Sequence, residues 1–384
     1  MKIAVIGQGY VGFPLAQLAA KSGFKVIGYD NNLKVIQSFD NSEPNLKLTD
    51  NEAFLIDCQI YVIAVPTPLD SQKKPDLTYV IKASEVIAKY AVSGSLVINE
   101  STSYPGTLRD VIMPIIDPSG VKVLFASAPE RIDPLNQDWN LSNTTRVIGG
   151  VTKEAGDMAV DFYSSFCKNV ISVSTPEVAE SAKLLENTFR QVNIAFINQF
   201  TQIMDKLNIP VYEVIEAANT KPFGFMKFSP GLGVGGHCIP IDPIYLADKA
   251  ESSGAPASFI RSADQINNEM PKFVMDKASR LLGSDLSGKK VCIIGLSYKS
   301  DIADLRSSPA LKLWDLLEAT KAQVSYHDPF HPTFRGMKCV ELTSSQFDLA
   351  IVATRHSDLN TTHLHSSTKL ILDCTGSISG AHRL

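Results

Sequence analysis

The sequence lacks the features that mark several large classes of protein. It has six cysteines in 384 residues, and no two of them form a C-x-x-C pair. Such scatter argues against a disulfide framework or a metal site and is typical of reduced thiols in a cytosolic protein. No uninterrupted apolar run approaches the ~18 residues of a membrane-spanning helix, and no charged-then-apolar leader precedes the first predicted strand. We therefore expect a cytoplasmic protein with no membrane partner.

A strong excess of charge of one sign is also absent. The formal net charge is −4, with 20% charged and 44% hydrophobic residues, which describes an ordinary soluble protein. This balance argues against nucleic acid as a partner, although it permits a local basic pocket for phosphate groups. At 384 residues the chain is too long for one hydrophobic core, so two or three domains are expected.

The chain does contain an alternation of short apolar runs and helical stretches. The predicted strands are 3–6, 25–29, 60–65, 96–99, 123–126, 170–173, 290–294, 323–326, 349–352 and 370–373. Near-continuous apolar strands that alternate with helices predict parallel sheets covered on both faces. Residues 177–207 carry apolar side chains at helical spacing with no Pro or Gly inside, which predicts one long helix.

We therefore predict an α/β fold with two Rossmann-like, doubly wound parallel-sheet domains joined by a long central helix. The first domain, at 1–175, is predicted to bind a dinucleotide. A central helical region at 176–282 includes a cysteine-containing loop, and a smaller α/β domain follows at 283–384.

A glycine-rich turn, Gly7-Gln8-Gly9-Tyr10-Val11-Gly12, follows the first strand and opens a helix. Gly7 permits the tight turn, Gly9 lets backbone amides approach a pyrophosphate, and Gly12 lets the helix pack on the strand. Asp30 ends the second strand, where a carboxylate accepts hydrogen bonds from ribose hydroxyls and repels a 2′-phosphate. We therefore predict NAD, in preference to NADP, as the cofactor.

Three further loops follow predicted strands: Val65-Pro66-Thr67-Pro68, Glu100-Ser101-Thr102 and Ala128-Pro129-Glu130-Arg131. In an open α/β sheet the ligand crevice lies at the carboxyl ends of the strands, so these loops are expected to face the cofactor. For the first two, the alternative is an ordinary connecting loop without a role in binding. Glu130 can position a water or act as a base, and a solvated or ion-paired Glu is equally open.

Lys183 and Asn187 lie one turn apart on the long predicted helix, so both project from one face. An ammonium and a carboxamide on one face can hold an oxyanion as a hydride leaves its carbon. A solvated polar face is the alternative. In the last domain, Lys299 and Arg306 follow the first strand, where they can clamp phosphate or cofactor or can be plain surface cations.

Cys238 lies in the Gly/Pro-rich segment Lys221–Pro243, directly after Gly235-Gly236-His237. Oxidising an aldehyde requires a nucleophile to add first, and a thiolate can add to give a thiohemiacetal that loses a hydride and becomes a thioester. A cofactor motif together with this cysteine suggests oxidation of an alcohol to an acid on one protein. The alternative is a small buried core residue, but adjacent glycines and a following Pro disfavour it.

Taken together, these residues resemble the UDP-glucose/GDP-mannose dehydrogenase family of nucleotide-sugar 6-dehydrogenases, most closely the branch that oxidises UDP-N-acetylhexosamines. The resemblance covers essentially the whole chain. Its segments are GQGYVGFPLA (7–16), AVPTPLD (64–70), NESTSYPGT (99–107), SAPERIDP (127–134), KLLENTFRQVNIA (183–195), KPFGFMKFSPGLGVGGHCIPIDP (221–243) and GLSYKSDIADLRSSPA (295–310).

The resemblance implies NAD-dependent, four-electron oxidation of C6 of a UDP-sugar, with UDP-N-acetylglucosamine preferred. Cys238 is the implied nucleophile, Lys183 and Asn187 the oxyanion donors, and Asp242 the group that activates the hydrolytic water. Thr102 and Glu130 complete the implied catalytic set. The expected cofactor contacts are Gly7, Gly9, Tyr10, Val11, Gly12, Asp30, Pro66, Thr67, Thr102 and Arg306. The expected substrate contacts are Glu130, Arg131, Lys183, Asn187, Phe225, Gly235 and Lys299. The resemblance also implies a homodimer built on the central helix.

The chain departs from the family pattern in three places. The segment between Asp30 and Ile60 is short, so a helix on the adenine side is expected to be missing. Leu232 and Gln199 replace a frequent Pro and a frequent Glu.

Two other functions compete with this interpretation. A single-step NAD-dependent hydroxyacid dehydrogenase also uses Lys and Asn on a central helix but has no use for Cys238. A non-catalytic NAD-binding protein would bind the cofactor without turnover.

Overall fold

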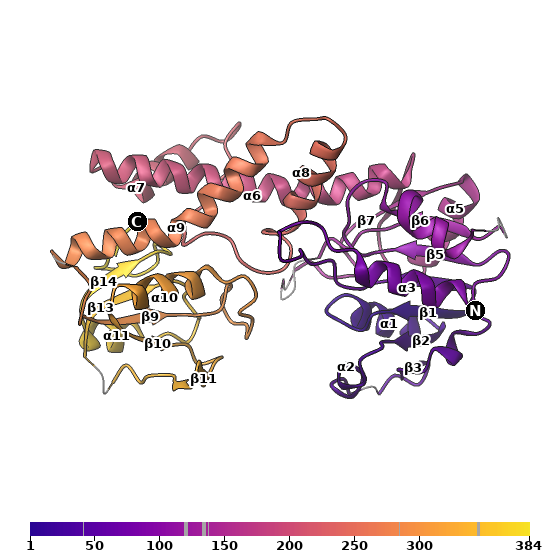
Figure 1. Cartoon of the computed structure of the whole chain (residues 1–384), viewed down its shortest axis with the longest axis horizontal. Helices are drawn as coiled ribbons and strands as arrows, with labels where there is room; N and C mark the ends of the chain where they lie inside the picture. The colour runs from indigo at the N-terminus through magenta and orange to yellow at the C-terminus, as the bar shows by residue number, and fades with distance from the viewer. Residues whose placement is uncertain (41, 119–121, 133–135, 137, 284, 344–345) are drawn as a thin grey trace. The chain divides into compact units, whose positions relative to one another are not determined.

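The structure, a computed structural model, describes residues 1–40, 42–118, 122–132, 136, 138–283, 285–343 and 346–384 (Figure 1). The chain forms two compact units: residues 1–186 with 244–256, here called unit 1, and residues 187–243 with 257–384, called unit 2. Helices α6 (Pro176–Leu207) and α8 (Asp242–Ser252) each contribute residues to both units. The division into three parts predicted from the sequence stays a prediction.

Unit 1 is built on an eight-stranded sheet in the order β3-β2-β1-β4-β5-β6-β7-β8. Its strands are β1 (Lys2–Ile6), β2 (Lys25–Tyr29), β3 (Leu46–Thr49), β4 (Ile60–Ile63), β5 (Leu96–Asn99), β6 (Leu124–Ser127), β7 (Arg146–Gly150) and β8 (Val170–Val173). Neighbouring strands are parallel except for β6 and β7, which pair antiparallel. The expected parallel sheet is thus confirmed up to β6, and β7, which the sequence analysis did not predict, is the exception.

Helices and short helical turns flank this sheet. They are α1 (Gly12–Lys21), α2 (Leu33–Gln37), α3 (Thr78–Ala88), α4 (Met113–Ile116) and α5 (Lys153–Ser164), with short helical turns η1 (Glu52–Leu55) and η2 (Leu108–Ile112). Helix α1 contacts β1, β2 and β3, and α5 contacts β5 to β8. The expectation that a helix after Asp30 is missing is wrong, because α2 is present with five residues. The Asn32 side chain caps its first turn by accepting a hydrogen bond from the Lys34 amide.

The first turns of α6 belong to unit 1 and are held there by a buried carboxylate. Glu180 is 1% exposed and accepts hydrogen bonds from the Gly106 amide (2.8 Å), the Leu108 amide (3.2 Å) and the Ser127 hydroxyl (3.0 Å). Burial raises the pKa of Glu180 to about 7 against these donors, which lower it. Glu180 therefore fixes the segment after β5 and the end of β6 against α6.

Unit 2 contains a five-stranded parallel sheet in the order β10-β9-β13-β14-β15. Its strands are β9 (Lys290–Ile294), β10 (Gln323–His327), β13 (Phe347–Val352), β14 (Thr368–Asp373) and β15 (His382–Arg383), with a small antiparallel pair β11 (Thr333–Phe334) and β12 (Met337–Lys338). Its helices are α7 (Val211–Asn219), α9 (Ser258–Leu282), α10 (Pro309–Ala319) and α11 (Thr361–Ser367). The second α/β domain expected from the sequence is confirmed.

The turn after the first strand is the same in both sheets. Gly7 and Gly295 have positive φ angles of 92° and 82°. Each donates its amide to the end of the neighbouring strand, to the carbonyl of Tyr29 (2.8 Å) and of His327 (2.9 Å). A Cβ atom would lie 2.6 Å from a backbone oxygen at Gly7 and 2.1 Å at Gly295, so neither position accepts a side chain.

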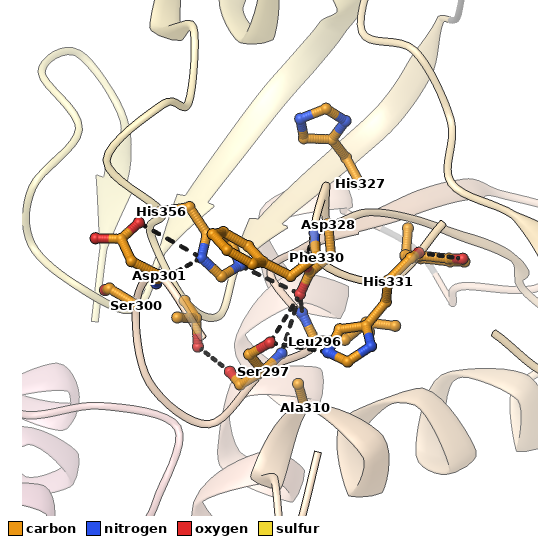
Figure 2. A network of polar contacts seen from close by, with 12 residues as sticks. Leu296, Ser297, Ser300, Asp301, Ala310, His327, Asp328, Phe330, His331 and His356 are labelled. Carbon is orange, nitrogen blue, oxygen red and sulfur yellow. Dashed lines mark hydrogen bonds and ion pairs between the residues drawn. The ribbon is translucent and has the colours of Figure 1, made fainter. Parts of the chain in front are cut away.

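In unit 2, Asp328 follows β10, and its side chain points toward Leu296 and Ser297 of this turn (Figure 2). It is fully buried, and its Oδ2 accepts from the amides of Leu296 (2.7 Å) and Ser297 (3.1 Å). The Nε2 of His356 lies 3.2 Å from the same oxygen, and His356 Nδ1 accepts from the Asp301 amide at 2.9 Å. Both ends of the loop that carries Lys299 are thereby tied to one carboxylate–imidazole pair.

We predict that Asp328 contributes to stability in a pH-dependent way. Burial raises its pKa, but the hydrogen bonds from His356, Ser297 and Leu296 outweigh this and hold the pKa at about 2. Because the folded-state pKa lies below the unfolded value, this stability is present above about pH 4 and is lost as the pH falls through about 2. At pH 7 it amounts to about 2 kcal/mol.

Asp328→Asn should therefore lower the free energy of unfolding at pH 7 by about that amount or more, since it also breaks the network. The difference from wild type should shrink below pH 4. Chemical denaturation across the pH range measures both, with the exposed Asp358→Asn as control. A wild-type-minus-variant difference that does not change with pH would contradict the assignment.

Candidate active site

The glycine-rich turn of unit 1 leaves backbone room where a pyrophosphate would approach. A Cβ on Gly12 would lie 1.8 Å from the Gly7 carbonyl oxygen, so this glycine is required by the packing of α1 on the turn. A Cβ on Gly9 would meet nothing within 4 Å, so the protein itself does not require glycine there. Tyr10 is 65% exposed and Val11 half-buried. The turn fits a dinucleotide phosphate at the N-terminus of α1.

Asp30 is half-buried at the end of β2 and takes part in the same turn. Its Oδ2 accepts from the Gln8 amide and its Oδ1 from the Asn32 amide, both at 2.9 Å. These two amides fix the direction of the carboxylate while leaving lone pairs on both oxygens. The side chain is thus prepared for the ribose contact that the sequence predicts.

The loops after β4 and β5 are locked to each other. The Ser101 hydroxyl donates to the Val65 carbonyl (2.7 Å) and accepts from the Val65 amide (2.9 Å). Thr67 is buried, Pro66 is exposed and Thr102 is half-buried. The structure therefore brings the predicted cofactor loops to one edge of the sheet, and the contacts of Pro66, Thr67 and Thr102 with ligand stay predictions.

Glu130 follows β6 and belongs to an ion cluster that the sequence analysis missed. Its Oε2 lies 3.0 Å from Nη2 of Arg146, and Nη1 of Arg146 lies 3.6 Å from Oε1 of Glu100. Tyr163 donates its hydroxyl to Glu100. Glu130 is 7% exposed. The sequence left open whether this Glu is solvated or ion-paired, and the structure shows the ion pair. The available signal was Arg146 itself, a cation that opens the apolar run Val147-Ile148.

Arg131 connects the same loop to α6. Its guanidinium pairs with Glu186 at 2.5 Å and donates to the Thr145 carbonyl at 2.9 Å. The predicted substrate contact of Arg131 stays a prediction beside this observed role. On α6, Lys183 is 7% and Asn187 6% exposed, so the alternative of a solvated polar face is wrong for both.

In unit 2, residues 231–238, here called the cysteine loop, pack closely on the segment after β9. A Cβ on Gly235 would lie 2.5 Å from Tyr298 Cβ, and one on Gly236 would lie 2.8 Å from the Tyr298 ring. A Cβ on Gly233 would lie 2.6 Å from the Asn267 carbonyl oxygen. The Gly236 amide donates to the Arg306 carbonyl at 2.9 Å. The glycines of this loop are therefore explained by contact with protein, and the predicted role of Gly235 in substrate binding is untested.

Cys238 is exposed at the end of this loop, one turn before α8. Its carbonyl accepts from the amides of Ile241 (3.1 Å) and Asp242 (2.9 Å), which places it at the amino end of the helical turn leading into α8. Amide dipoles at such an end favour negative charge. Asp242 is 3% exposed and accepts from Asn187 Nδ2 at 2.5 Å, so the structure joins two predicted catalytic residues directly.

A second polar network anchors the start of the cysteine loop. Asn198 of α6 accepts from the Gly231 amide (3.0 Å) and donates to Asn267 of α9 (3.0 Å). Asn267 in turn donates to the Gln191 carbonyl at 3.2 Å. No period or motif in the sequence singled out these amides.

The remaining predicted residues lie near the loop or are exposed. Arg306 forms an ion pair with Asp304 at 2.6 Å. Burial lowers the pKa of His237, and the charge of Arg306 lowers it further. Lys299 is half-buried on the loop organised by Asp328. Phe225 is 37% exposed. Ligand contacts of Arg306, Lys299 and Phe225 stay predictions.

Two kinds of feature are absent from the residues that the structure describes. No helix in this part of the chain has an apolar stretch long enough to cross a bilayer. In the same residues, no group of three or more His, Cys, Asp or Glu side chains is placed to hold a metal ion.

Comparison with known proteins agrees with this geometry. Models of the UDP-glucose/GDP-mannose dehydrogenase family match the chain in three parts: the NAD binding domain at 1–47 and 40–167, the central domain at 177–269 and the UDP binding domain at 292–379. The chain is 35% identical to the UDP-N-acetyl-D-mannosamine dehydrogenase of Methanocaldococcus jannaschii, over 93% of this chain and 86% of that protein.

A second relative is the UDP-N-acetyl-D-glucosamine 6-dehydrogenase of Pseudomonas aeruginosa, which is 34% identical over 96% of this chain and 94% of that protein. Among solved structures, the UDP-D-ManNAc dehydrogenase of Pyrococcus horikoshii superposes with a TM-score of 0.89 at 33% identity, covering 100% of this chain and 98% of that one. With an NAD binding domain, a central domain and a UDP binding domain in this order, the chain belongs to the UDP-glucose/GDP-mannose dehydrogenase family.

Proposed function

We propose that this enzyme oxidises C6 of a UDP-N-acetylhexosamine to the uronic acid in two NAD-dependent steps, by way of a Cys238 thioester. One observation carries the proposal. The exposed thiol of Cys238 lies one turn before Asp242, whose buried carboxylate is hydrogen-bonded to Asn187 on α6. A nucleophile, a carboxylate for the hydrolytic step and an amide donor are therefore present on one unit.

The roles follow from the chemistry of each group. When bound, NAD accepts a hydride from C6 in each of the two steps. The first removes a hydride and a proton from the alcohol and leaves an aldehyde. The Cys238 thiol then adds to that aldehyde, and loss of a second hydride and proton from the adduct gives the thioester. Water cleaves the thioester and regenerates the thiol, and in this scheme Asp242 activates that water.

Lys183 and Asn187 support the oxyanions in this scheme. An ionised Asp242 carboxylate can only accept hydrogen bonds, so the Asn187 side chain turns its amide nitrogen toward it. That nitrogen has two N–H groups, and the second one remains for a hydrogen bond to substrate. Lys183 is buried, and among the described residues no side chain forms an ion pair with it. A buried ammonium without a fixed counter-charge is suited to a charge that develops during the reaction.

The proposal includes a homodimer built on α6. Four large apolar side chains of this helix are exposed in unit 2: Phe189, Phe196, Ile203 and Leu207, at 46–62%. Their spacing puts them on one side of the helix, and such an apolar stripe on a long helix supports a contact with a second copy.

The sugar is proposed as an acetamido sugar, with UDP-N-acetylglucosamine first and its manno epimer second. Relatives named for either epimer have almost the same identity to this chain, 34% and 35%. Support for the acetamido class comes from both names and from the segments KPFGF and GGHCIP.

A panel of UDP-sugars assayed for NADH formation tests the function. We expect two NADH per substrate consumed and an acid product with a UDP-N-acetylhexosamine. UDP-glucose should have a much lower kcat/KM, because a site built for an amide leaves buried polar groups unpaired with a hydroxyl. One NADH per substrate would favour a hydroxyacid dehydrogenase, and NAD binding without turnover would favour a sensing protein.

Cys238→Ala should abolish acid formation while leaving NAD affinity unchanged, because the thioester cannot form. Cys238 is the one exposed cysteine of the six, all of which the structure describes. A limiting amount of an alkylating agent should therefore modify Cys238 first, with loss of activity in proportion, as peptide mass spectrometry can follow. Wild-type turnover with two NADH in the variant would exclude the covalent route.

Lys183→Met should lower kcat by roughly a hundredfold or more, since one lost oxyanion donor costs about 2.7–4 kcal/mol. The loss should appear in kcat and not in KM, because the charge develops in the transition state. Lys206→Met, an exposed lysine in the last turn of the same helix, is the matched control. A variant in which KM alone changes would place Lys183 in ground-state binding.

A further inference from the structure

A buried ion cluster lies behind the Glu130 loop of unit 1. Arg146 at the start of β7 is 4% exposed, and its guanidinium contacts both Glu130 (3.0 Å) and Glu100 (3.6 Å). Tyr163 of α5 donates its hydroxyl to Glu100, and its ring centroid lies 4.9 Å from the guanidinium carbon of Arg146. One cation therefore serves two carboxylates in a nearly dry environment.

Stability alone does not account for such a cluster. Taking three charges out of water is costly, and replacing buried ion clusters by apolar side chains is often neutral or stabilising. The arrangement does, however, give one of the carboxylates a fixed direction. Oε1 of Glu130 accepts from the amides of Arg131 (2.5 Å) and Ile132, while Oε2 is held by Arg146.

We propose that Arg146 is a positioning residue for the reaction: it orients the Glu130 carboxylate, while Glu100 and Tyr163 hold Arg146 from the other side. The inference rests on the proposed function and takes Glu130 as a residue of the catalytic site, as the family resemblance implies. Arg146 itself acts through Glu130.

The charged and titratable groups around Arg146 come from several elements of unit 1. Arg146 is faced by Glu100 after β5, Glu130 after β6, Tyr163 of α5 and Cys167 shortly after α5. The Arg131 side chain turns away to Glu186. Burial is the largest cause that raises the pKa of Glu100, to about 7; Arg146 lowers this pKa, Glu130 raises it and Tyr163 lowers it. The two carboxylates thus share one counter-charge.

Two substitutions disturb the cluster to different extents. In Arg146→Lys, a single ammonium replaces the fork that bridges both carboxylates, so the direction of the Glu130 carboxylate is no longer fixed. In Glu100→Gln, the side chain keeps its shape but loses its charge, so Arg146 is held less firmly while its contact with Glu130 stays. A purely structural cluster would lose stability in both variants without a fall in kcat under conditions where the variants are folded.

The test is the steady-state kinetics of the folded variants with the UDP-N-acetylhexosamine that the wild type oxidises. We expect kcat of Arg146→Lys to fall about tenfold to a hundredfold, as for a misplaced catalytic group, with KM for NAD within about twofold of wild type. The fall in Glu100→Gln should be smaller and should again appear in kcat and not in KM for NAD. Arg109→Lys is the matched control, because Arg109 pairs with Glu177 at 2.6 Å elsewhere in unit 1. Its kcat should stay at the wild-type value.

A wild-type kcat in folded Arg146→Lys, or a change in KM for NAD as large as that in kcat, overturns the proposal. If Arg146→Lys does not fold, Glu100→Gln decides alone: a lower kcat at unchanged KM for NAD supports the proposal and an unchanged kcat overturns it. A wild type that oxidises no UDP-sugar would refute the proposed function instead. In that case the infrared band of the Glu130 carboxylate, assigned with Glu130→Gln, should shift in Arg146→Lys without turnover, and an unshifted band overturns the proposal.

Discussion

The burial of polar side chains along helix α6 is the constraint on which the rest of the structure depends. A buried carboxylate or amide is tolerated only when it has hydrogen-bond partners, so each such side chain fixes a particular loop. Glu180 holds the turn at Gly106, Asn187 holds Asp242, and Asn198 holds Gly231 at the start of the cysteine loop. Apolar side chains at these three positions would make none of these hydrogen bonds.

The cysteine loop depends on a second constraint, which is steric. The backbone of Gly235 and Gly236 lies against Tyr298, and that of Gly233 against Asn267, with no room for a Cβ. This close packing fixes the backbone up to Cys238 from one side, and the carbonyl contacts of Cys238 with the turn before α8 fix it from the other. A thiol that must reach an aldehyde carbon requires such definition, because effective concentration depends on geometry.

The two sheets use one turn for two purposes. Asp30 follows β2 and Asp328 follows β10, each the second strand along the chain in its sheet. Each carboxylate accepts a hydrogen bond from the amide of the residue after the turn glycine, which is Gln8 in unit 1 and Leu296 in unit 2. Asp30 is half-buried and keeps lone pairs for a ribose, whereas Asp328 is fully buried under His356 and cannot offer its carboxylate to a ligand. The same local geometry is therefore a binding device in unit 1 and a structural brace in unit 2.

The sequence by itself determined the elements whose cause is local. Apolar runs identified the central strands, helical periodicity identified α6 within one residue of its bounds (177–207 predicted, Pro176–Leu207 observed), and the spacing of Gly7, Gly9 and Gly12 identified the dinucleotide turn. Family resemblance added Lys183, Asn187, Cys238 and Asp242 as a set. The sequence analysis missed strand β7 because its apolar run is only Val147-Ile148, between Arg146 and two glycines. It missed helix α2 because five residues are too few to show a helical period.

Only the tertiary structure decided which polar residues are partners. Arg146 is distant in sequence from both Glu100 and Glu130, and Asn187 is 55 residues from Asp242. Whether a charge is solvated or buried depends on what packs over it, which no local pattern encodes. For the same reason the sequence left Glu130 and Lys183 open between a functional and a surface role, and burial removed the surface role for both.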